Sequence, residues 1–435
     1  MQMQVRRWKD VSRDEQQRFL KRSELDISNI QDSIQDILDK VRADGDTALR
    51  ALTNKLDKVD LSSIPLRITD EEFAAAADAL DPAVKEALDH AFDNVTRFHK
   101  GQVPAADTMM EIEPGIIVGE RHTPIDSVGL YVPHGRGSFP SMVYMQSIPA
   151  KLAGVPRIVM VTPPGPDGRV DPAVLYAAAA TGVDEVYRVG GPHAIAALAY
   201  GTETIARVDK IQGPGSMYVT AAKRLLVGTV DIGMPAGPSE SIIIADRHAD
   251  PYTVALDLII EAEHGSDSSA ILISTSEPVA EAVADILPDL IDEVEEPRKG
   301  FLQDVFGNYG GIFLAGDLYE AADIVNQFAP EHLQIRTSEP WATMRLIRNA
   351  SEILLGSHIP FSIANYITGP NAILPTGGNA RTYSALSVRD FIKYSSVVYL
   401  EPSGYDRVAG KVTTLADYEG FQTHAKAIRE RNRSL

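Results

Sequence analysis

The sequence of 435 residues contains no cysteine. A disulfide is therefore excluded, which is consistent with a reducing compartment. The absence also limits metal chemistry, because a zinc site in this chain can use only His, Asp, Glu, Asn, Gln or water. A thiol nucleophile, of the kind that many aldehyde dehydrogenases use, is excluded as well. Aldehyde oxidation without a thiol adduct requires a hydrate, whose C–H bond can donate the hydride.

Long apolar runs are also missing, since no stretch approaches the roughly 18 residues that span a bilayer. Met1–Trp8 contains two adjacent arginines but no apolar stretch follows it, as one would in a secretory signal. We therefore expect a cytoplasmic protein. Positive charge is in deficit: 41 Lys and Arg face 60 Asp and Glu, a formal net charge of −19. Such a surface disfavours nucleic acid and anionic membranes as partners.

The glycine fingerprint of dinucleotide-binding loops, G-x-G-x-x-G, occurs nowhere in the sequence. Two stretches begin like it, Gly135-Arg-Gly137 and Gly213-Pro-Gly215. Pro140 and Tyr218 stand where the third glycine belongs. A dinucleotide, if it binds, does so without the usual phosphate fingerprint.

Short apolar runs alternate with segments of helical length from about residue 126 onward. This alternation is typical of parallel sheets with right-handed crossovers, in which ligands bind at the carboxyl ends of the strands. The expected strands are 128–132, 157–162, 185–189, the region of Ile211, 242–245, 270–274, 311–315, 332–336 and 352–355. The expected helices include 141–153, 172–181, 192–200, 254–263 and 318–328.

The chain is too long for one ordinary domain, and its length predicts two large domains or several smaller ones. Residues from about 8 to 100 have helical periodicity, with apolar residues at 30, 34, 37, 38 and 41. The segment after about 385 is polar and is expected to be helical. We expect an N-terminal helical segment over 1–25, a first α/β domain of 26–129 with 241–384, a second α/β domain over 130–240, and a tail over 385–435.

Glu261-Ala-Glu-His264 is a candidate metal site. Its first and last residues are three apart on a predicted helix, so their side chains face one direction. Carboxylate and imidazole together suit zinc, manganese or iron. The alternative is an exposed Glu and a His at a helix end, because Gly265 follows. A di-iron bundle needs two Glu-x-x-His motifs, and no other His here has a Glu three residues before it.

Pro330-Glu-His-Leu333 places an acid and a base side by side at the start of a predicted strand. Neighbouring strand residues point to opposite faces, so Glu331 and His332 are not expected to act on the same atom. A histidine with a near-neutral pKa is the natural proton acceptor for an alcohol at pH 7, although a structural His at a sheet edge fits too. Pro235–Glu240 is either a rigid turn that presents Ser239 to a ligand or a plain crossover loop.

In this order, these features resemble the histidinol dehydrogenase family, and the likeness covers nearly the whole chain. The motifs are specific for the family and much less specific for the substrate. The supporting stretches are 129–133, 190–202, 208–215 and 371–376. The resemblance implies an α/β fold of two incomplete Rossmann-like, doubly wound domains with small helical terminal segments. It also implies a homodimer that exchanges its tails, with bound zinc and NAD.

The activity that the resemblance implies is oxidation of an alcohol through an aldehyde to a carboxylate, with two NAD. His332 would be the base, and Glu331 would activate water for the second step. The implied zinc ligands are Glu261, His264, Asn365 and, from the partner's tail, His424. The implied NAD contacts are Tyr131, His193 and Ser216, and the implied substrate contacts include Ser239, Tyr366 and Glu419.

Several positions depart from the family pattern. Glu261 replaces a Gln and Asn365 replaces an Asp among the zinc ligands, and the two changes cancel in charge. Because random loss would not be expected to conserve that charge, we infer that a metal still binds. His193 and Ser216 stand where Gln and Asn are usual. Ala372 replaces a substrate-binding His, which weakens recognition of histidinol.

The loop after residue 133 has His134-Gly-Arg136 where the family usually has Gly-Gly-Ser. Cationic donors suit a carboxylate, sulfonate or phosphate on the substrate. Alternatively, Arg136 pairs with a surface acid or touches the NAD pyrophosphate. The expected substrate is thus histidinol or another small polar alcohol such as dihydroxypropanesulfonate. A non-redox metal-binding protein, for example a hydrolase, is the alternative from another class.

Overall fold

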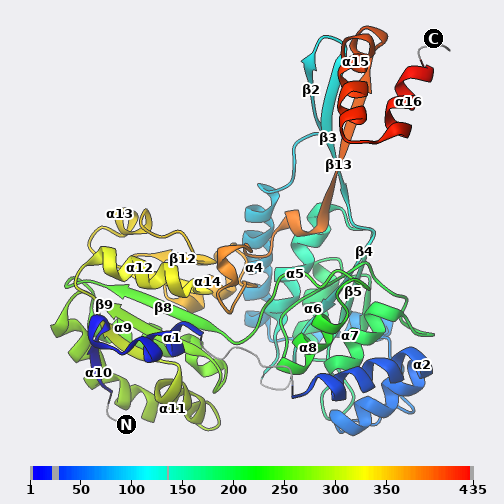
Figure 1. The fold of residues 1–435 in the computed structure, drawn as a ribbon. Coiled ribbons are helices and arrows are strands. Elements are labelled where there is room, and N and C mark those ends of the chain that lie inside the picture. The colour runs from blue at the N-terminus through cyan, green and yellow to red at the C-terminus, as the bar shows by residue number, and fades with distance from the viewer. Residues whose placement is uncertain (1–2, 22–28, 135–136, 432–435) are drawn as a thin grey trace. The chain divides into compact units, whose positions relative to one another are not determined.

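The computed structural model describes residues 3–21, 29–134 and 137–431 (Figure 1). Two compact units form: Met1–Gln102 with Ile125–Phe391, and Val103–Pro124 with Ile392–Leu435. Within the described ranges, no helix combines the length and the apolar character needed to cross a membrane. The domain boundaries expected from the sequence stay a prediction.

A four-stranded parallel sheet lies in the first unit, with the strand order β6-β5-β4-β7. The chain moves outward from β4 to β6 and then returns to the other side of β4. The strand order therefore reverses between β4 and β7. The strands are β4 (Ser127–Tyr131), β5 (Arg157–Val161), β6 (Glu185–Tyr187) and β7 (Lys210–Gln212), and the helices are α5 (Pro140–Ala153), α6 (Pro172–Ala180), α7 (Gly191–Tyr200) and α8 (Met217–Leu225).

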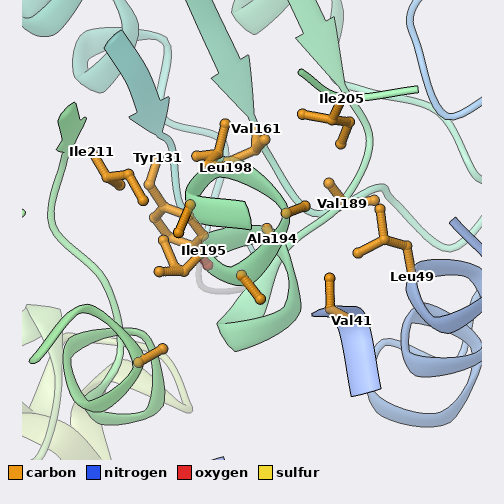
Figure 2. Packing of buried hydrophobic residues seen from close by; sticks show 14 of the residues in the cluster. Val41, Leu49, Tyr131, Val161, Val189, Ala194, Ile195, Leu198, Ile205 and Ile211 are labelled. Atoms are coloured by element: carbon orange, nitrogen blue, oxygen red, sulfur yellow. The ribbon is translucent and has the colours of Figure 1, made fainter. Parts of the chain in front are cut away.

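The helix α2 (Gln31–Leu56) packs onto this sheet through α7 and α8. Its buried Ile34, Leu38 and Val41 confirm the helical spacing expected from the sequence. Figure 2 shows part of the resulting core, with apolar side chains from α2, β4, β5, α7 and β7. Three more helices of this region are α3 (Asp70–Asp78), α4 (Pro82–Lys100) and η4 (Val388–Phe391).

A second, six-stranded parallel sheet in the same unit has the order β1-β10-β9-β8-β11-β12. β11, β12 and α12 begin and end at the predicted residues. β1 was not predicted, because three residues are too few to reveal a strand period. The strands are β1 (Val5–Arg7), β8 (Glu240–Ala245), β9 (Ser269–Ser274), β10 (Gly311–Leu314), β11 (His332–Arg336) and β12 (Glu352–Leu355).

Helices connect and cover this second sheet, and their apolar sides form two core clusters with its strands. They are η1 (Trp8–Asp10), α1 (Arg13–Lys21), α9 (Pro251–Ile260), η2 (Glu261–His264), α10 (Glu277–Asp292), α11 (Arg298–Asn308), α12 (Leu318–Phe328), α13 (Pro340–Met344) and α14 (Phe361–Tyr366). A further short helix of this unit, η3 (Asn379–Arg381), has no buried residue. The expected α/β class with two doubly wound parallel sheets is confirmed.

The second unit contains an antiparallel sheet of order β13-β3-β2, from β2 (Thr108–Glu113), β3 (Ile116–Pro124) and β13 (Ile392–Leu400). Two helices complete it, α15 (Pro402–Tyr418) and α16 (Gln422–Arg431). The expectation of a helical tail was wrong for β13. Most of its side chains are exposed, so it lacks the buried alternate face that marks a strand in the sequence.

Candidate active site

The predicted catalytic residues Glu331 and His332 lie, together with Glu261, at the amino edge of the six-stranded sheet. Glu240, His332 and Glu352 are the first residues of β8, β11 and β12. The register pairs His332 with Glu352 and with Ser241, so these parallel strands begin side by side. A crossover helix runs back antiparallel to its strands, and the end of α9 therefore brings Glu261 to the same edge. The carboxyl ends, where the sequence placed ligands, are the opposite edge of this sheet.

His332 is only 3% exposed and is anchored through one ring nitrogen. Its Nδ1 lies 2.7 Å from Oε2 of the buried Glu352. With Nδ1–H donating to this carboxylate, a neutral ring has its basic lone pair on Nε2. Nε2 lies 3.8 Å from Oε1 of Glu331 and 3.9 Å from Oε2 of Glu261. One nitrogen thus fixes the ring, and the other faces two carboxylates beyond hydrogen-bond range.

From the sequence, Glu352 is predicted only as the start of a strand. The one available signal was a carboxylate at the head of the apolar run 353–355. A charged residue is rarely buried unless it is paired. Its partner, twenty positions away, emerges only when β11 and β12 are aligned in register.

Three carboxylates control the pKa of His332. Burial lowers this pKa, but attraction to Glu261 and Glu331 and the hydrogen bond to Glu352 outweigh burial and raise it to about 10. Among these side chains alone the ring is therefore protonated at pH 7. For His332 to have the near-neutral pKa expected from the sequence, part of the negative charge of these carboxylates must be offset.

Glu331 lies on the same side as His332, and the expectation of opposite faces was wrong. Glu331 sits in the bend before β11, where strand alternation does not yet apply. Its Oε2 accepts a hydrogen bond of 2.9 Å from the backbone N–H of Glu240. Burial raises its pKa well above the usual range, and nearby Glu261 and Glu240 add to this, although His332 opposes it.

Glu261 and His264 lie on the 3-10 helix η2 rather than on an α-helix. Three residues per turn place them one above the other, with Glu261 Oε2 3.6 Å from His264 Nε2. Asn365 Nδ2 donates a 2.7 Å hydrogen bond to the other Glu261 oxygen. Burial raises the pKa of Glu261, but His332, His264 and Asn365 outweigh it, so the pKa is lowered and the carboxylate is anionic.

The donor set at Glu261 fits a divalent cation. The buried carboxylate lies beside the two other predicted ligands of this unit, the His264 imidazole and the Asn365 amide. Asn365 Oδ1 is buried without a hydrogen-bond partner in the described part of the chain, which is unusual for an amide oxygen. No group of three or more His, Asp or Glu among the described residues is arranged to hold a metal. Of the predicted zinc ligands, only Glu261 and His264 count toward such a group in the first unit. Asn365 is an amide, and His424 belongs to the second unit.

The residues expected to contact NAD lie around the four-stranded sheet. Tyr131 ends β4, and its hydroxyl accepts a 3.2 Å hydrogen bond from Gly191 N. Ser216 follows β7 and is exposed at the N-cap of α8, where its hydroxyl makes no capping bond. Both residues flank the reversal of strand order between β4 and β7, the place where such sheets bind nucleotides.

His193 is fully buried, in contrast to Ser216. Its Nε2 lies 3.1 Å from the Thr53 hydroxyl of α2, and burial lowers its pKa to about 4. His134 is half-buried, three residues after β4. Arg136 lies outside the described residues. The predicted contacts of these residues with cofactor or substrate stay predictions.

The predicted substrate contacts fall in both units. Tyr366 belongs to the first unit, is 59% exposed, and follows Asn365 on α14. Ser239 immediately precedes β8, next to Glu240. Glu419 and His424 are exposed residues of the second unit. By contrast, the structure brings five of the predicted residues close together within the first unit, namely Glu261, His264, Asn365, Glu331 and His332.

Known proteins that resemble this chain match it over nearly its whole length. The family model described as histidinol dehydrogenase matches residues 20–432. A histidinol dehydrogenase from Synechocystis sp. is 48% identical over 415 residues, covering 95% of this chain and 96% of the relative. A histidinol dehydrogenase homolog from Rhizobium meliloti is 48% identical over 419 residues, covering 96% and 92%.

A solved structure agrees with the sequence matches. The crystal structure of histidinol dehydrogenase from Elizabethkingia anophelis superposes with a TM-score of 0.93 at 32% identity, covering 100% of this chain and 98% of the other. The order of strands, the buried acid–base cluster and these similarities lead to one assignment. The chain belongs to the histidinol dehydrogenase family of oxidoreductases.

Proposed function

We propose that the protein is a zinc- and NAD-dependent dehydrogenase that oxidises a small polar primary alcohol, through an aldehyde and its hydrate, to a carboxylate. One observation carries this proposal. The buried His332 is anchored by Glu352 through Nδ1, and its Nε2 faces Glu331. An anchored base beside a second carboxylate of raised pKa is suited to two successive proton transfers.

Zinc would be held by Glu261, His264 and Asn365, with His424 of a second copy completing the set. The support is the anionic buried carboxylate and the unpartnered amide oxygen of Asn365. When bound, zinc would polarise the substrate oxygen and offset the charge of Glu261, one of the groups that raise the pKa of His332.

In the first oxidation, His332 takes the hydroxyl proton of the alcohol on Nε2. Glu352 holds the ring in place and stabilises the imidazolium that forms, because its carboxylate accepts the Nδ1 proton in a hydrogen bond. NAD, when bound, would supply the hydride acceptor, one molecule for each oxidation. Tyr131 and Ser216 are proposed to contact the cofactor, together with His193.

In the second oxidation, Glu331 removes a proton from water as the water oxygen attacks the aldehyde carbon. His332 returns its proton to the aldehyde oxygen, which completes the hydrate. His332 then takes a hydroxyl proton again as the hydrate loses its hydride. The Glu331 carboxylate suits this task because Glu240 N holds one oxygen and the raised pKa makes it a stronger base.

The alcohol itself is the open part of the proposal. Relatives at 48% identity include one named histidinol dehydrogenase and one named only a homolog. Ala372 packs against an apolar cluster and offers no imidazole to a substrate. We propose Ser239, Tyr366 and Glu419 as substrate contacts, with His134 and Arg136 favouring an anionic alcohol over histidinol. A cytoplasmic homodimer with exchanged tails belongs to the same proposal.

The test is a screen of small alcohols with NAD and zinc, including histidinol and dihydroxypropanesulfonate. NADH formed is compared with alcohol consumed. Two NADH per alcohol supports the full course, whereas one NADH contradicts the second oxidation. Zinc binding without NADH from any alcohol would favour the non-redox alternative.

A further inference from the structure

A buried polar ladder runs away from the candidate site along one face of β11. His332, Gln334 and Arg336 alternate with core residues and share this face. Thr253, Asp257 and Glu261 are spaced by four residues, so they share one stripe of α9 and its extension η2.

Each rung of the ladder joins the strand to the helix. His332 Nε2 lies 3.9 Å from Glu261 Oε2 at the site. Gln334 Nε2 donates to Asp257 Oδ2 at 2.6 Å, and Arg336 Nη1 donates to the same oxygen at 2.9 Å. Arg336 Nη2 donates to the Thr253 hydroxyl.

The rungs stay in register for a geometric reason. Two residues of a strand advance about 6.6 Å. Four residues of an α-helix advance about 6 Å. Because the two steps nearly match, fixing the Asp257 rung also fixes the height of Glu261 opposite His332.

The same side chains also hold the loop that leads to α14. Gln334 Nε2 donates to the Ile359 carbonyl at 2.8 Å, and Arg336 Nη1 donates to the Ser357 carbonyl at 3.4 Å. This loop leads directly into α14, which carries Asn365. The ladder thus ties together the three elements that bring Glu261, His332 and Asn365 to one place.

Stability alone is a poor explanation for this arrangement. Asp257, Gln334 and Arg336 are 5%, 0% and 4% exposed. Replacing a buried ion pair by apolar residues of similar volume is often neutral or stabilising, because burial of the charges is costly. Gln334 Oε1 and Arg336 Nε moreover have no hydrogen-bond partner within the described ranges. A polar cluster at this cost is better explained by the geometry that it imposes.

We propose that Asp257, Gln334 and Arg336 are positioning residues that set how tightly Glu261 and Asn365 hold a divalent cation. This inference rests on the metal site of the proposed function. Groups that orient metal ligands from behind typically change metal affinity by about 10–100-fold when they are replaced.

The experiment measures zinc affinity of the metal-stripped, full-length protein by competition with a chelating indicator. Asp257→Leu/Arg336→Met removes both charges together, so that neither is left buried alone. We expect its zinc affinity to fall by about 10–100-fold, while the metal-free melting temperature stays close to that of the wild type. Gln334→Met should weaken zinc binding in the same direction and by less.

A matched control removes an Arg–carboxylate pair from the other sheet. Arg157→Met/Glu185→Leu deletes hydrogen bonds of 2.9 and 3.1 Å and should leave zinc affinity unchanged. Wild-type zinc affinity in the ladder variant overturns the inference, and Gln334→Met decides by the same criterion if the double variant does not fold. Zinc binding that survives Glu261→Ala overturns the proposed metal site itself, and this inference with it.

Discussion

His332 and His193 are both buried, one at each parallel sheet, yet their pKa values move in opposite directions. Burial lowers the pKa of His193 to about 4, although Asp57 Oδ2 lies 3.7 Å from its Nε2. Burial also lowers that of His332, but surrounding carboxylates raise it to about 10. The surroundings of a buried histidine thus decide whether the ring stays neutral or carries a proton at pH 7.

The two parallel sheets also differ in which edge carries the predicted site residues. At the four-stranded sheet, Tyr131 and Ser216 lie at the carboxyl ends, where parallel sheets usually bind ligands. At the six-stranded sheet, the charged cluster lies at the amino ends. We infer that one sheet serves cofactor binding in the customary way, while the other supplies acid–base chemistry from its opposite edge.

The largest expected effect is that of His332→Asn. Without the base, kcat for both oxidations should fall by about 10²–10⁴-fold. The measurement is steady-state NADH formation from the alcohol and, separately, from the aldehyde. His90→Asn, an exposed histidine on α4, is the control. Normal turnover by His332→Asn would show that His332 is not the base, and the proposed difference in role from His193 would then be wrong.

Glu331→Gln should separate the two oxidations. The amide cannot take a proton from water, whereas His332 remains to serve the alcohol. The yield should therefore drop from two NADH per alcohol to one, with aldehyde released, as measured by NADH and aldehyde in the same sample. Equal loss of both oxidations would contradict this division of labour.

Glu352 tests whether its hydrogen bond makes His332 a working base. Glu352→Leu should lower kcat by about 10–100-fold, the usual effect of losing a group that orients a reactive side chain. Glu352→Gln keeps an acceptor for Nδ1–H and should recover part of that loss, with a shifted pH profile of kcat. Identical kinetics for the two variants would reduce Glu352 to a packing residue.

The smallest effect on the reaction, but a clear one on stability, is expected from His193→Gln, because Gln is the usual family residue at this proposed cofactor contact. The folded-state pKa of His193 is about 4, below its ordinary 6.5. The unfolded chain therefore binds a proton first as pH falls, and stability is lost from about pH 6.5 downward to about 4. At pH 5 the loss is about 2 kcal/mol relative to neutral pH. Gln should reduce this acid dependence in denaturant titrations, and an unchanged slope would contradict a neutral His193.

Much of the fold could be predicted from local pattern. Strands β11 and β12 and helix α12 begin and end where hydrophobic periodicity placed them. Strands β1 and β13 could not be predicted in this way, since one is very short and the other is mostly exposed. Hydrophobic periodicity reveals a strand when one of its faces is buried over several residues, and neither of these strands has such a face.

The sequence by itself determined the chemical limits of this protein. Without cysteine, aldehyde oxidation must use a hydrate and a zinc ion must use nitrogen or oxygen donors. Local spacing was enough to pair Glu261 with His264. Only the tertiary structure decided that Glu352 anchors His332, that Glu331 shares its side, and that Asp257 and Arg336 lie behind the site. Those contacts depend on strand order and on helix-to-strand register, which local sequence patterns do not contain.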